Sequence, residues 1–292
     1  MAVKGIDVSR WQGDVDFEKV RAAGYDFVII NAGYGMYISQ KDKYFDANYE
    51  KARAAGLGVG AYWYSYALSA AQAKEEAKVF LKAVGDRSFE YPLCFDIEDS
   101  SQSKLSSTLI GQMCDAFCSY LEDRGYYAAI YSYANFLENK VPAQCKRRYD
   151  VWVAAFDVAR PPYSGTYGMW QYSSHGSVSG VSGDVDLDYA YKDYPAIMRE
   201  KGLNGFKGGK SALDSNGLKK GDRSEGVLAL KQLLILAKQE GLTAQSVDNN
   251  DGFGSGTEKA VNALLGDWGY AENGIAGGGF IKRLGRELGV RK

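Results

Sequence analysis

The chain has 292 residues, of which 46% are hydrophobic and 24% charged, so it can fill a sizeable core and is neither a disordered nor a disulfide-stapled chain. Lys and Arg number 35 and Asp and Glu 36, which leaves no basic field to attract nucleic acid, and we expect no nucleic-acid partner. The single histidine, His175, excludes metal sites that need two or three imidazoles, and we expect neither a metal nor another cofactor.

Eight short runs rich in β-branched and aromatic residues predict eight strands. Stretches with helical periodicity separate most of these runs, an alternation that indicates parallel strands joined by helices. Eight such strands predict an α/β fold, an irregular (β/α) TIM-like barrel that closes on itself. In chain order the predicted strands cover residues 3–7, 26–32, 58–65, 91–98, 127–132, 151–156, 167–172 and 186–190.

Three helices between these strands have clear end signals. Asp16, Ser69 and Ser106 or Ser107 can cap their first turns, and a glycine follows the last turn of each. After Tyr149 the connecting segments are short and rich in Pro, Gly and Ser, so the last third of the barrel has room for little helix. The predicted helices cover residues 17–23 and 70–84, and a third ends at residue 124.

Residues 204–216 have the composition of a flexible linker, with several glycines among Asn, Ser and Lys. We therefore predict a barrel domain over residues 1–203 and a small, mainly helical domain over residues 217–292. The first five residues hold one Lys and no apolar segment, and no window approaches the roughly 18 apolar residues that span a bilayer. We expect synthesis in the cytoplasm without a signal peptide, and no membrane insertion.

The densest acidic group is Asp96-Ile97-Glu98-Asp99, at the end of the fourth predicted strand. Residues two apart on a strand point to the same face, about 6.6 Å apart, so Asp96 and Glu98 are expected to face the barrel mouth together. Two close carboxylates raise the pKa of one of them, which leaves a protonated acid beside an ionised partner, as glycosidic bond cleavage requires. The structural alternative is that the pair caps the following loop and its helix.

Further acidic and aromatic residues fall at the same predicted rim. Asp7 ends the first strand and Asp186 begins the last, and these two strands are neighbours in a closed barrel. Active sites of such barrels lie at this rim. Aromatic rings combined with carboxylates suit a sugar polymer, because pyranose faces stack on rings while hydroxyls take hydrogen bonds. The rings in or just after a predicted strand are Trp11, Tyr34, Tyr62, Tyr64, Tyr131, Trp152 and Trp170.

Residues 1 to about 200 resemble a glycoside hydrolase family 25 lysozyme through four ordered motifs. The resemblance implies an irregular β/α barrel that cleaves the β-1,4 bond between N-acetylmuramic acid and N-acetylglucosamine in bacterial peptidoglycan, its expected partner. The motifs are Asp7-x-Ser9-x-Trp11-Gln12, Phe95-Asp96-Ile97-Glu98, Trp170-Gln171-Tyr172 and Val185-Asp186-Leu187.

Matching positions in these motifs imply roles for four carboxylates. Glu98 corresponds to the general acid and Asp96 to the group that assists the substrate's 2-acetamido group. Asp7 and Asp186 correspond to two outer carboxylates of the same site, although which of Asp184, Asp186 and Asp188 enters it stays open. The expected substrate contacts are Tyr34, Tyr62, Tyr64, Tyr131, Trp152, Trp170 and Gln171.

From about Leu218 the chain resembles the small helical peptidoglycan-binding domain of wall hydrolases, and we expect a cell-wall-binding domain here. The matching segments include Gly221-Asp222, Asp251-Gly252-x-Gly254 and Asn273-Gly274-Ile275. This layout is similar to a bacteriophage endolysin made in the host cytoplasm. Two alternatives remain: a non-catalytic cell-wall carbohydrate-binding protein, whose sequence signature would be loss of an acid, and a hydrolase of another N-acetylated glucan such as chitin.

Overall fold

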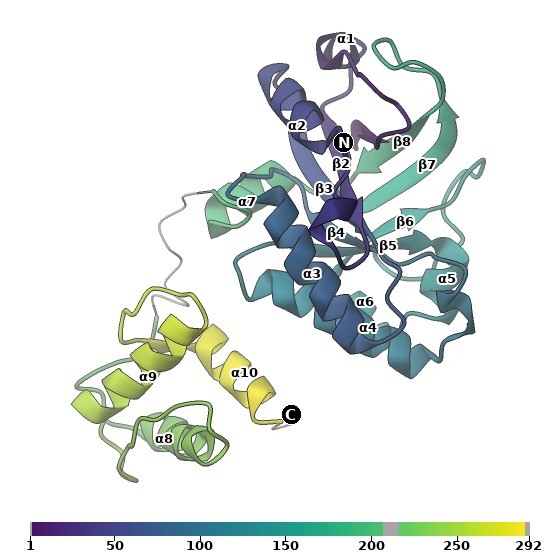
Figure 1. The fold of residues 1–292 in the computed structure, drawn as a ribbon. Coiled ribbons are helices and arrows are strands. Elements are labelled where there is room, and N and C mark those ends of the chain that lie inside the picture. The colour runs from purple at the N-terminus through teal and green to yellow at the C-terminus, as the bar shows by residue number, and fades with distance from the viewer. Residues whose placement is uncertain (1, 207–215, 290–292) are drawn as a thin grey trace. The chain divides into compact units, whose positions relative to one another are not determined.

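The computed structural model describes residues 2–206 and 216–289, and the chain divides into two compact units, Met1–Phe206 and Lys207–Lys292 (Figure 1). The first unit is a closed barrel whose eight strands are neighbours in sequence order. Each predicted strand is present, and the predicted fold class is confirmed. The strands are β1 (Val3–Val8), β2 (Phe27–Tyr34), β3 (Gly58–Tyr64), β4 (Leu93–Asp96), β5 (Ala128–Tyr133), β6 (Asp150–Ala154), β7 (Met169–Gly176) and β8 (Val185–Ala190).

The direction of β8 differs from the sequence prediction. β1 to β7 pair in parallel, but β8 is antiparallel to both β7 and β1. Parallel pairing needs a crossover of a dozen or more residues, and only residues 177–184 join β7 to β8. The reversal places the start of β8 beside the end of β1, where Asp186 is the direct ladder partner of Asp7.

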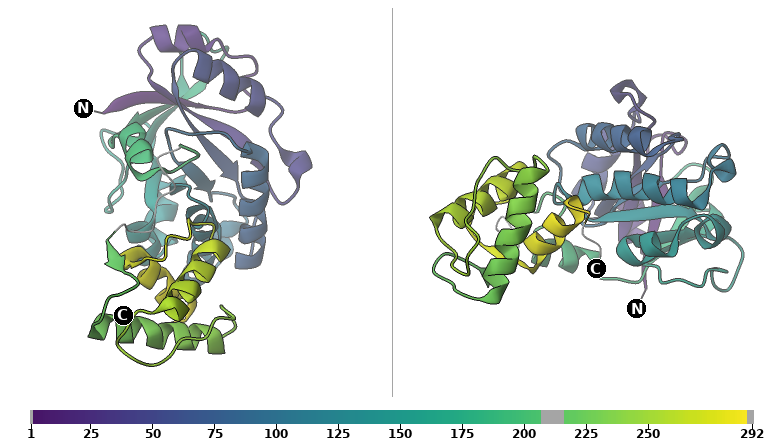
Figure 2. Two further views of the ribbon diagram at one scale, coloured as in Figure 1. Left: turned by 90° about the vertical axis from the view of Figure 1, so that its left-hand side faces the viewer. Right: turned by 90° about the horizontal axis from the view of Figure 1, so that it is seen from below.

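Helices pack on the outside of the barrel along β2 to β6, where α3 and α4 lie side by side (Figure 2), and none occurs among the described residues between β6 and β8. The predicted N-caps are confirmed: Asp16, Ser69 and Ser106 each accept a hydrogen bond from the backbone N–H three residues later. The helices are α1 (Phe17–Ala22), α2 (Phe45–Ala54), α3 (Ala70–Val84), α4 (Ser107–Glu122), α5 (Ala134–Asn139), α6 (Ala143–Arg148) and α7 (Tyr194–Lys201), with short 3-10 turns η1 (Ile38–Gln40) and η2 (Gln102–Lys104).

Alternation along β4 decides which residues reach the barrel mouth. Phe95 points outward and stacks on Phe117 of α4, with ring centroids 4.2 Å apart. Asp96 therefore faces the interior side. The alternation continues beyond the strand, because Ile97 is fully buried in the layer between barrel and helices and Glu98 lines the barrel mouth.

The predicted linker begins too early. Of residues 204–216, residues 207–215 lie outside the described residues, but Asn204 belongs to the barrel unit and is 0% exposed. Its side chain accepts a hydrogen bond from the backbone N–H of Tyr127 and donates one to the carbonyl of Tyr91. The composition of the segment does not predict this, because it depends on one side-chain amide that hydrogen-bonds to the residues just before two strands.

The second unit is small and mainly helical. It holds α8 (Glu225–Gln239), α9 (Ser255–Asp267) and α10 (Gly278–Glu287), with a two-stranded ladder of β9 (Gly217–Leu218) and β10 (Ala276–Gly277). Its own apolar core includes Leu230, Leu234, Val261, Leu264 and Phe280. In the part of the chain that the structure describes, no helix combines the length and apolar character that crossing a bilayer requires.

Candidate active site

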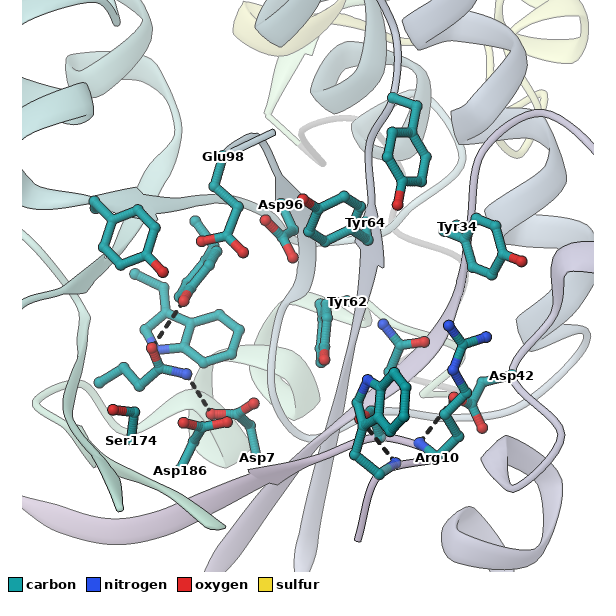
Figure 3. Close-up of a pocket in the computed structure, with 18 of the residues that line it drawn as sticks. Asp7, Arg10, Tyr34, Asp42, Tyr62, Tyr64, Asp96, Glu98, Ser174 and Asp186 are labelled. Atoms are coloured by element: carbon teal, nitrogen blue, oxygen red, sulfur yellow. Dashed lines mark hydrogen bonds between the residues drawn. The ribbon is translucent and has the colours of Figure 1, made fainter. Parts of the chain in front are cut away.

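A cavity of about 480 Å³ opens at the barrel rim where β1 to β5 end (Figure 3). All four predicted carboxylates line it. Six of the seven predicted contact residues line it as well, and Trp170 does not. The lining residues are Asp7, Ser9, Arg10, Trp11, Asn31, Tyr34, Asp42, Tyr62, Tyr64, Tyr66, Asp96, Glu98, Tyr131, Tyr133, Trp152, Phe156, Gln171, Ser174 and Asp186.

The backbone around Asp96 and Glu98 is fixed by hydrogen bonds to neighbouring strand ends. Ile97, between them, donates its N–H to the carbonyl of Tyr131 at 3.0 Å, and its own carbonyl accepts from the Ser132 hydroxyl at 2.6 Å. This extended backbone presents both carboxyl groups to the cavity. Oδ1 of Asp96 and Oε2 of Glu98 are buried and receive no hydrogen bond from the described residues.

Burial and neighbouring negative charges raise the pKa of both acids. For Asp96, burial is the larger cause and the charge of Glu98 the second, and the pKa lies well above its ordinary value. For Glu98, burial followed by the charges of Asp186 and Asp99 raises the pKa to about 7. Glu98 can therefore carry a proton near neutral pH, which a general acid needs.

The capping alternative applies to Asp99 instead. Its Oδ1 accepts from both the backbone N–H and the hydroxyl of Ser101, and its own N–H donates to Gln102. The two hydrogen bonds from Ser101 lower the pKa of Asp99, with the Ser101 hydroxyl as the largest cause. The loop after β4 is thus closed by Asp99, and Asp96 and Glu98 remain available to the cavity.

Asp7 is oriented by a buried amide. Gln171 donates from Nε2 to Oδ2 of Asp7 at 2.7 Å, and its Oε1 accepts from the Tyr131 hydroxyl at 2.8 Å. The pKa of Asp7 is raised by burial first and then by the charges of Asp186 and Asp188. Figure 3 shows Asp7 and Asp186 together, across the cavity from Asp96 and Glu98.

Asp186 and Asp188 of β8, and Asp184 just before it, lie in three different environments. Asp186 lines the cavity, and burial raises its pKa to about 6. Asp188 is 0% exposed below it and accepts a hydrogen bond from Nε1 of Trp152 at 2.8 Å. The Asp184 side chain is 71% exposed, 3.4 Å from Nδ1 of His175. Of the three, Asp186 is therefore the acid that enters the site.

The aromatic residues differ in how they meet the cavity. Trp152 is 1% exposed and packs against Tyr131, with ring centroids 4.4 Å apart, so together they form part of the cavity's inner wall. Trp170, a predicted substrate contact, lies outside the cavity lining. Its neighbour Gln171 faces inward, so Trp170 points to the other side of the barrel wall, where Nε1 donates to the carbonyl of Ala155.

Nine lining residues were not among the predicted site residues. Some had a signal: Asn31 follows the inward alternation of β2, and Ser9 and Trp11 belong to the first motif. Others come from loops that only the fold brings together. No group of three His, Cys, Asp or Glu suited to a metal occurs within residues 2–206 and 216–289. The nine are Ser9, Arg10, Trp11, Asn31, Asp42, Tyr66, Tyr133, Phe156 and Ser174.

Converging carboxylates of raised pKa between aromatic rings, at the mouth of a barrel, define a glycoside hydrolase. The sequence profile described as Glycosyl hydrolases family 25 matches residues 6–181, and the chain belongs to this family. The chain is 32% identical over 186 residues to the Autolytic lysozyme of Clostridium acetobutylicum, an alignment that covers 64% of this chain and 55% of that protein.

Two solved structures share the barrel. The bacterial lysozyme from Streptomyces coelicolor is 32% identical, with a TM-score of 0.57, and the match covers 66% of this chain and 93% of that one. The modular autolysin LytC from Streptococcus pneumoniae, solved in complex with a synthetic peptidoglycan ligand, is 27% identical with a TM-score of 0.56. That match covers 65% of this chain and 47% of the autolysin.

Proposed function

We propose that the chain is an N-acetylmuramidase, which hydrolyses the β-1,4 bond between N-acetylmuramic acid and N-acetylglucosamine in bacterial peptidoglycan. The observation that carries the proposal is the pair Asp96 and Glu98 in one cavity, with the pKa of Glu98 raised to about 7. Support also comes from the relatives, which are named as lysozymes, and from the autolysin solved with a peptidoglycan ligand.

In this mechanism Glu98 is the general acid. It gives its proton to the glycosidic oxygen as the bond to the anomeric carbon breaks, so the leaving sugar departs with a neutral hydroxyl. The acetamido oxygen of the substrate, with its amide held by Asp96, attacks the anomeric carbon as an internal nucleophile. Water then opens the oxazolinium and returns a proton to Glu98. Substrate-assisted hydrolysis of this kind is an established exception to the two-carboxylate scheme.

Asp7 and Asp186 act from the opposite side of the cavity. The charge of Asp186 raises the pKa of Glu98 and so helps keep it protonated before the reaction. Asp7, held by Gln171, is placed to contact sugar hydroxyl groups. Direct attack by water would invert the anomeric configuration, whereas internal attack followed by water retains it, so the configuration of the first product distinguishes the two routes.

The test uses purified Gram-positive walls and the full chain. The wild-type protein should clear the suspension and leave new reducing ends on muramic acid, detected by mass analysis of the fragments. E98Q should turn over at less than about a hundredth of the wild-type rate while still binding walls, because the amide is too weak an acid to protonate the glycosidic oxygen. E75Q is the matched control, since Glu75 is exposed on α3 and pairs with Lys78.

Three results would contradict the proposal. Release of peptide stems without new reducing ends would identify a different bond. Turnover by E98Q above about a hundredth of the wild-type rate would remove Glu98 from the role of general acid. Cleavage of neutral chitin oligosaccharides with no action on walls would identify another N-acetylated glucan as the substrate.

A further inference from the structure

Arg10 is the one basic residue in the lining described for the cavity. Five of the other lining residues carry carboxyl groups: Asp7, Asp42, Asp96, Glu98 and Asp186. In Figure 3 Arg10 lies with Tyr34 and Asp42 to one side, away from Glu98 and Asp186. An acidic groove repels anions, so a single cation in its wall creates one place where an anionic group of a substrate can be accepted.

The Arg10 guanidinium has no carboxylate partner among the described residues. It lies over two rings instead, with its central carbon 5.2 Å from the centroid of Trp11 and 5.4 Å from that of Tyr34. The nearby Asp42 is engaged by the backbone, since Oδ2 accepts from the N–H of Arg10 and Oδ1 from the N–H of Tyr44. These cation–π contacts favour this position of the guanidinium, and its N–H groups have no carboxylate partner in the described part of the chain that would compete with a ligand.

The loop that carries Arg10 is built as a turn. The backbone N–H of Ser9 donates a hydrogen bond to the side-chain oxygen of Gln12, and the backbone N–H of Gln12 donates one to the Ser9 carbonyl. The Gln12 amide also donates to the carbonyl of Asp184, which ties the turn to the loop before β8. The backbone that carries Arg10 is therefore fixed at the cavity edge before any ligand arrives, which reduces the entropy lost on binding.

Aromatic rings connect this position with the acids. Tyr66 is edge-on to Tyr34 at 5.9 Å between centroids and lies 5.0 Å from Tyr64. Tyr64 in turn donates its hydroxyl to Asp99, in the loop that follows Glu98. Trp11, the other ring that the Arg10 guanidinium contacts, is 80% exposed. A glycan that passes Glu98 can thus lie along these rings and bring a side arm to Arg10.

We propose that the Arg10 guanidinium binds a carboxylate on the lactyl side arm of the glycan, so that this part of the groove selects anionic over neutral N-acetylated sugars. The inference rests on the proposed function and deepens it, because N-acetylmuramic acid differs from N-acetylglucosamine by this lactyl ether. The carboxylate has two sources: the lactyl group itself where no peptide is attached, or a residue of the attached peptide stem. A guanidinium binds either through paired N–H groups.

The experiment compares three soluble glycans. The first keeps its peptide stems, the second has been stripped by an amidase and exposes lactyl carboxylates, and the third is the stripped glycan converted to neutral methylamides. R10Q should lower kcat/KM about three- to tenfold on a glycan whose carboxylate Arg10 binds, and leave the methylamide unchanged. R10K should recover part of the loss. R147Q is the control, because Arg147 is exposed on α6 outside the cavity.

Salt gives a second readout. Raising ionic strength from about 0.01 M to about 1 M shortens the Debye length from about 30 Å to about 3 Å, which should lower kcat/KM of the wild type more than that of R10Q. Binding constants of E98Q and of the double variant E98Q/R10Q for the same three glycans, measured over the same range of ionic strength, report recognition without turnover. A loss confined to the first glycan identifies a stem carboxylate, and a loss on the second identifies the lactyl carboxylate.

Two results overturn this inference. An equal loss on the methylamide would show that Arg10 only shapes the groove, and the absence of loss on every glycan, in rate and in binding, would show that it contacts no anion. Both are distinct from failure of the proposed function, in which the wild type cleaves none of the three glycans. In that case the binding constants still decide whether Arg10 recognises a carboxylate.

Discussion

Three causes raise the pKa of Glu98 to about 7, and the contribution of one of them can be measured separately. Burial is the largest, the negative charge of Asp186 is the second, and the charge of Asp99 is the third. Replacing Asp186 by asparagine removes the charge and leaves the burial, so the pKa of Glu98 should fall but stay above its ordinary value of 4.5. The protonated fraction of Glu98 near neutral pH should fall with it.

This predicts a change in the pH dependence of D186N. Because Glu98 acts in its protonated form, kcat/KM of the wild type should drop about tenfold per pH unit above about 7. In D186N the same drop should begin at lower pH. A pH profile on soluble peptidoglycan fragments measures it, with D184N as the control because Asp184 is exposed outside the cavity. An unshifted alkaline limb in D186N, or an equal shift in D184N, would contradict the assignment.

At the scale of elements, a buried polar network joins the loops after β3 and β4. Glu76 of α3 accepts from the Ser65 hydroxyl at 2.6 Å and from the backbone N–H of Tyr66 at 2.9 Å. Gln102 donates to the carbonyls of Ser65 and Ala67 and accepts from Asp99. The network thereby positions Tyr66 at the cavity and the loop that follows Glu98. Burial is the largest cause that raises the pKa of Glu76, to about 7.

A raised pKa in the folded state has a defined effect on stability. The folded protein binds a proton on Glu76 more tightly than the unfolded chain, whose pKa is near 4.5, so this group lowers the free energy of unfolding as pH rises from about 4.5 to about 7. In E76Q that loss is absent. The difference in unfolding free energy between wild type and E76Q should therefore change by about 2–3 kcal/mol across this window.

Denaturant unfolding at pH 4.5 and pH 7 measures the effect of E76Q. E75Q is again the matched control, since the neighbouring Glu75 is exposed and its replacement should leave the pH dependence unchanged. A constant difference between wild type and E76Q at both pH values would mean that folding does not raise the pKa of Glu76.

The sequence predicts a structural feature when the interactions that produce it lie within one short segment of the chain. The caps at Asp16, Ser69 and Ser106 were predictable because each side chain bonds its own first helical turn. Asp96 and Glu98 were predictable because strand alternation fixes their shared face. The direction of β8 was not, since it follows from pairing with β1 and β7. The position of Trp170 outside the cavity lining follows from the alternation of faces along β7, where Gln171 faces inward.

At the scale of the whole molecule, the end of the barrel unit is set by Asn204. Besides its two side-chain hydrogen bonds, its backbone N–H donates to the carbonyl of Gly125 and its carbonyl accepts from Phe89. Its φ of 54° lies in the left-handed region, which asparagine tolerates better than most residues. The segment after α7 thus closes the barrel at the strand starts, before the second unit begins.

Two truncations follow from this boundary. A chain ending at Phe206 keeps Asn204 and should unfold as cooperatively as the barrel in the full protein, whereas a chain ending at Leu203 should lose about 2–5 kcal/mol, because it leaves buried backbone groups at two strand starts without partners. Thermal and denaturant unfolding of both chains compares them. Equal stability would mean that the strand starts hold without Asn204.

The chain that ends at Phe206 also tests the second unit, which we propose binds the cell wall. The chain of residues 1–206 contains every residue that lines the cavity, so it should cleave soluble peptidoglycan fragments at the rate of the full chain. On intact walls it should adsorb less and clear the suspension more slowly, because a tethered binding unit raises the local concentration of the barrel at the substrate. Equal adsorption of both chains to walls would assign wall binding to the barrel alone.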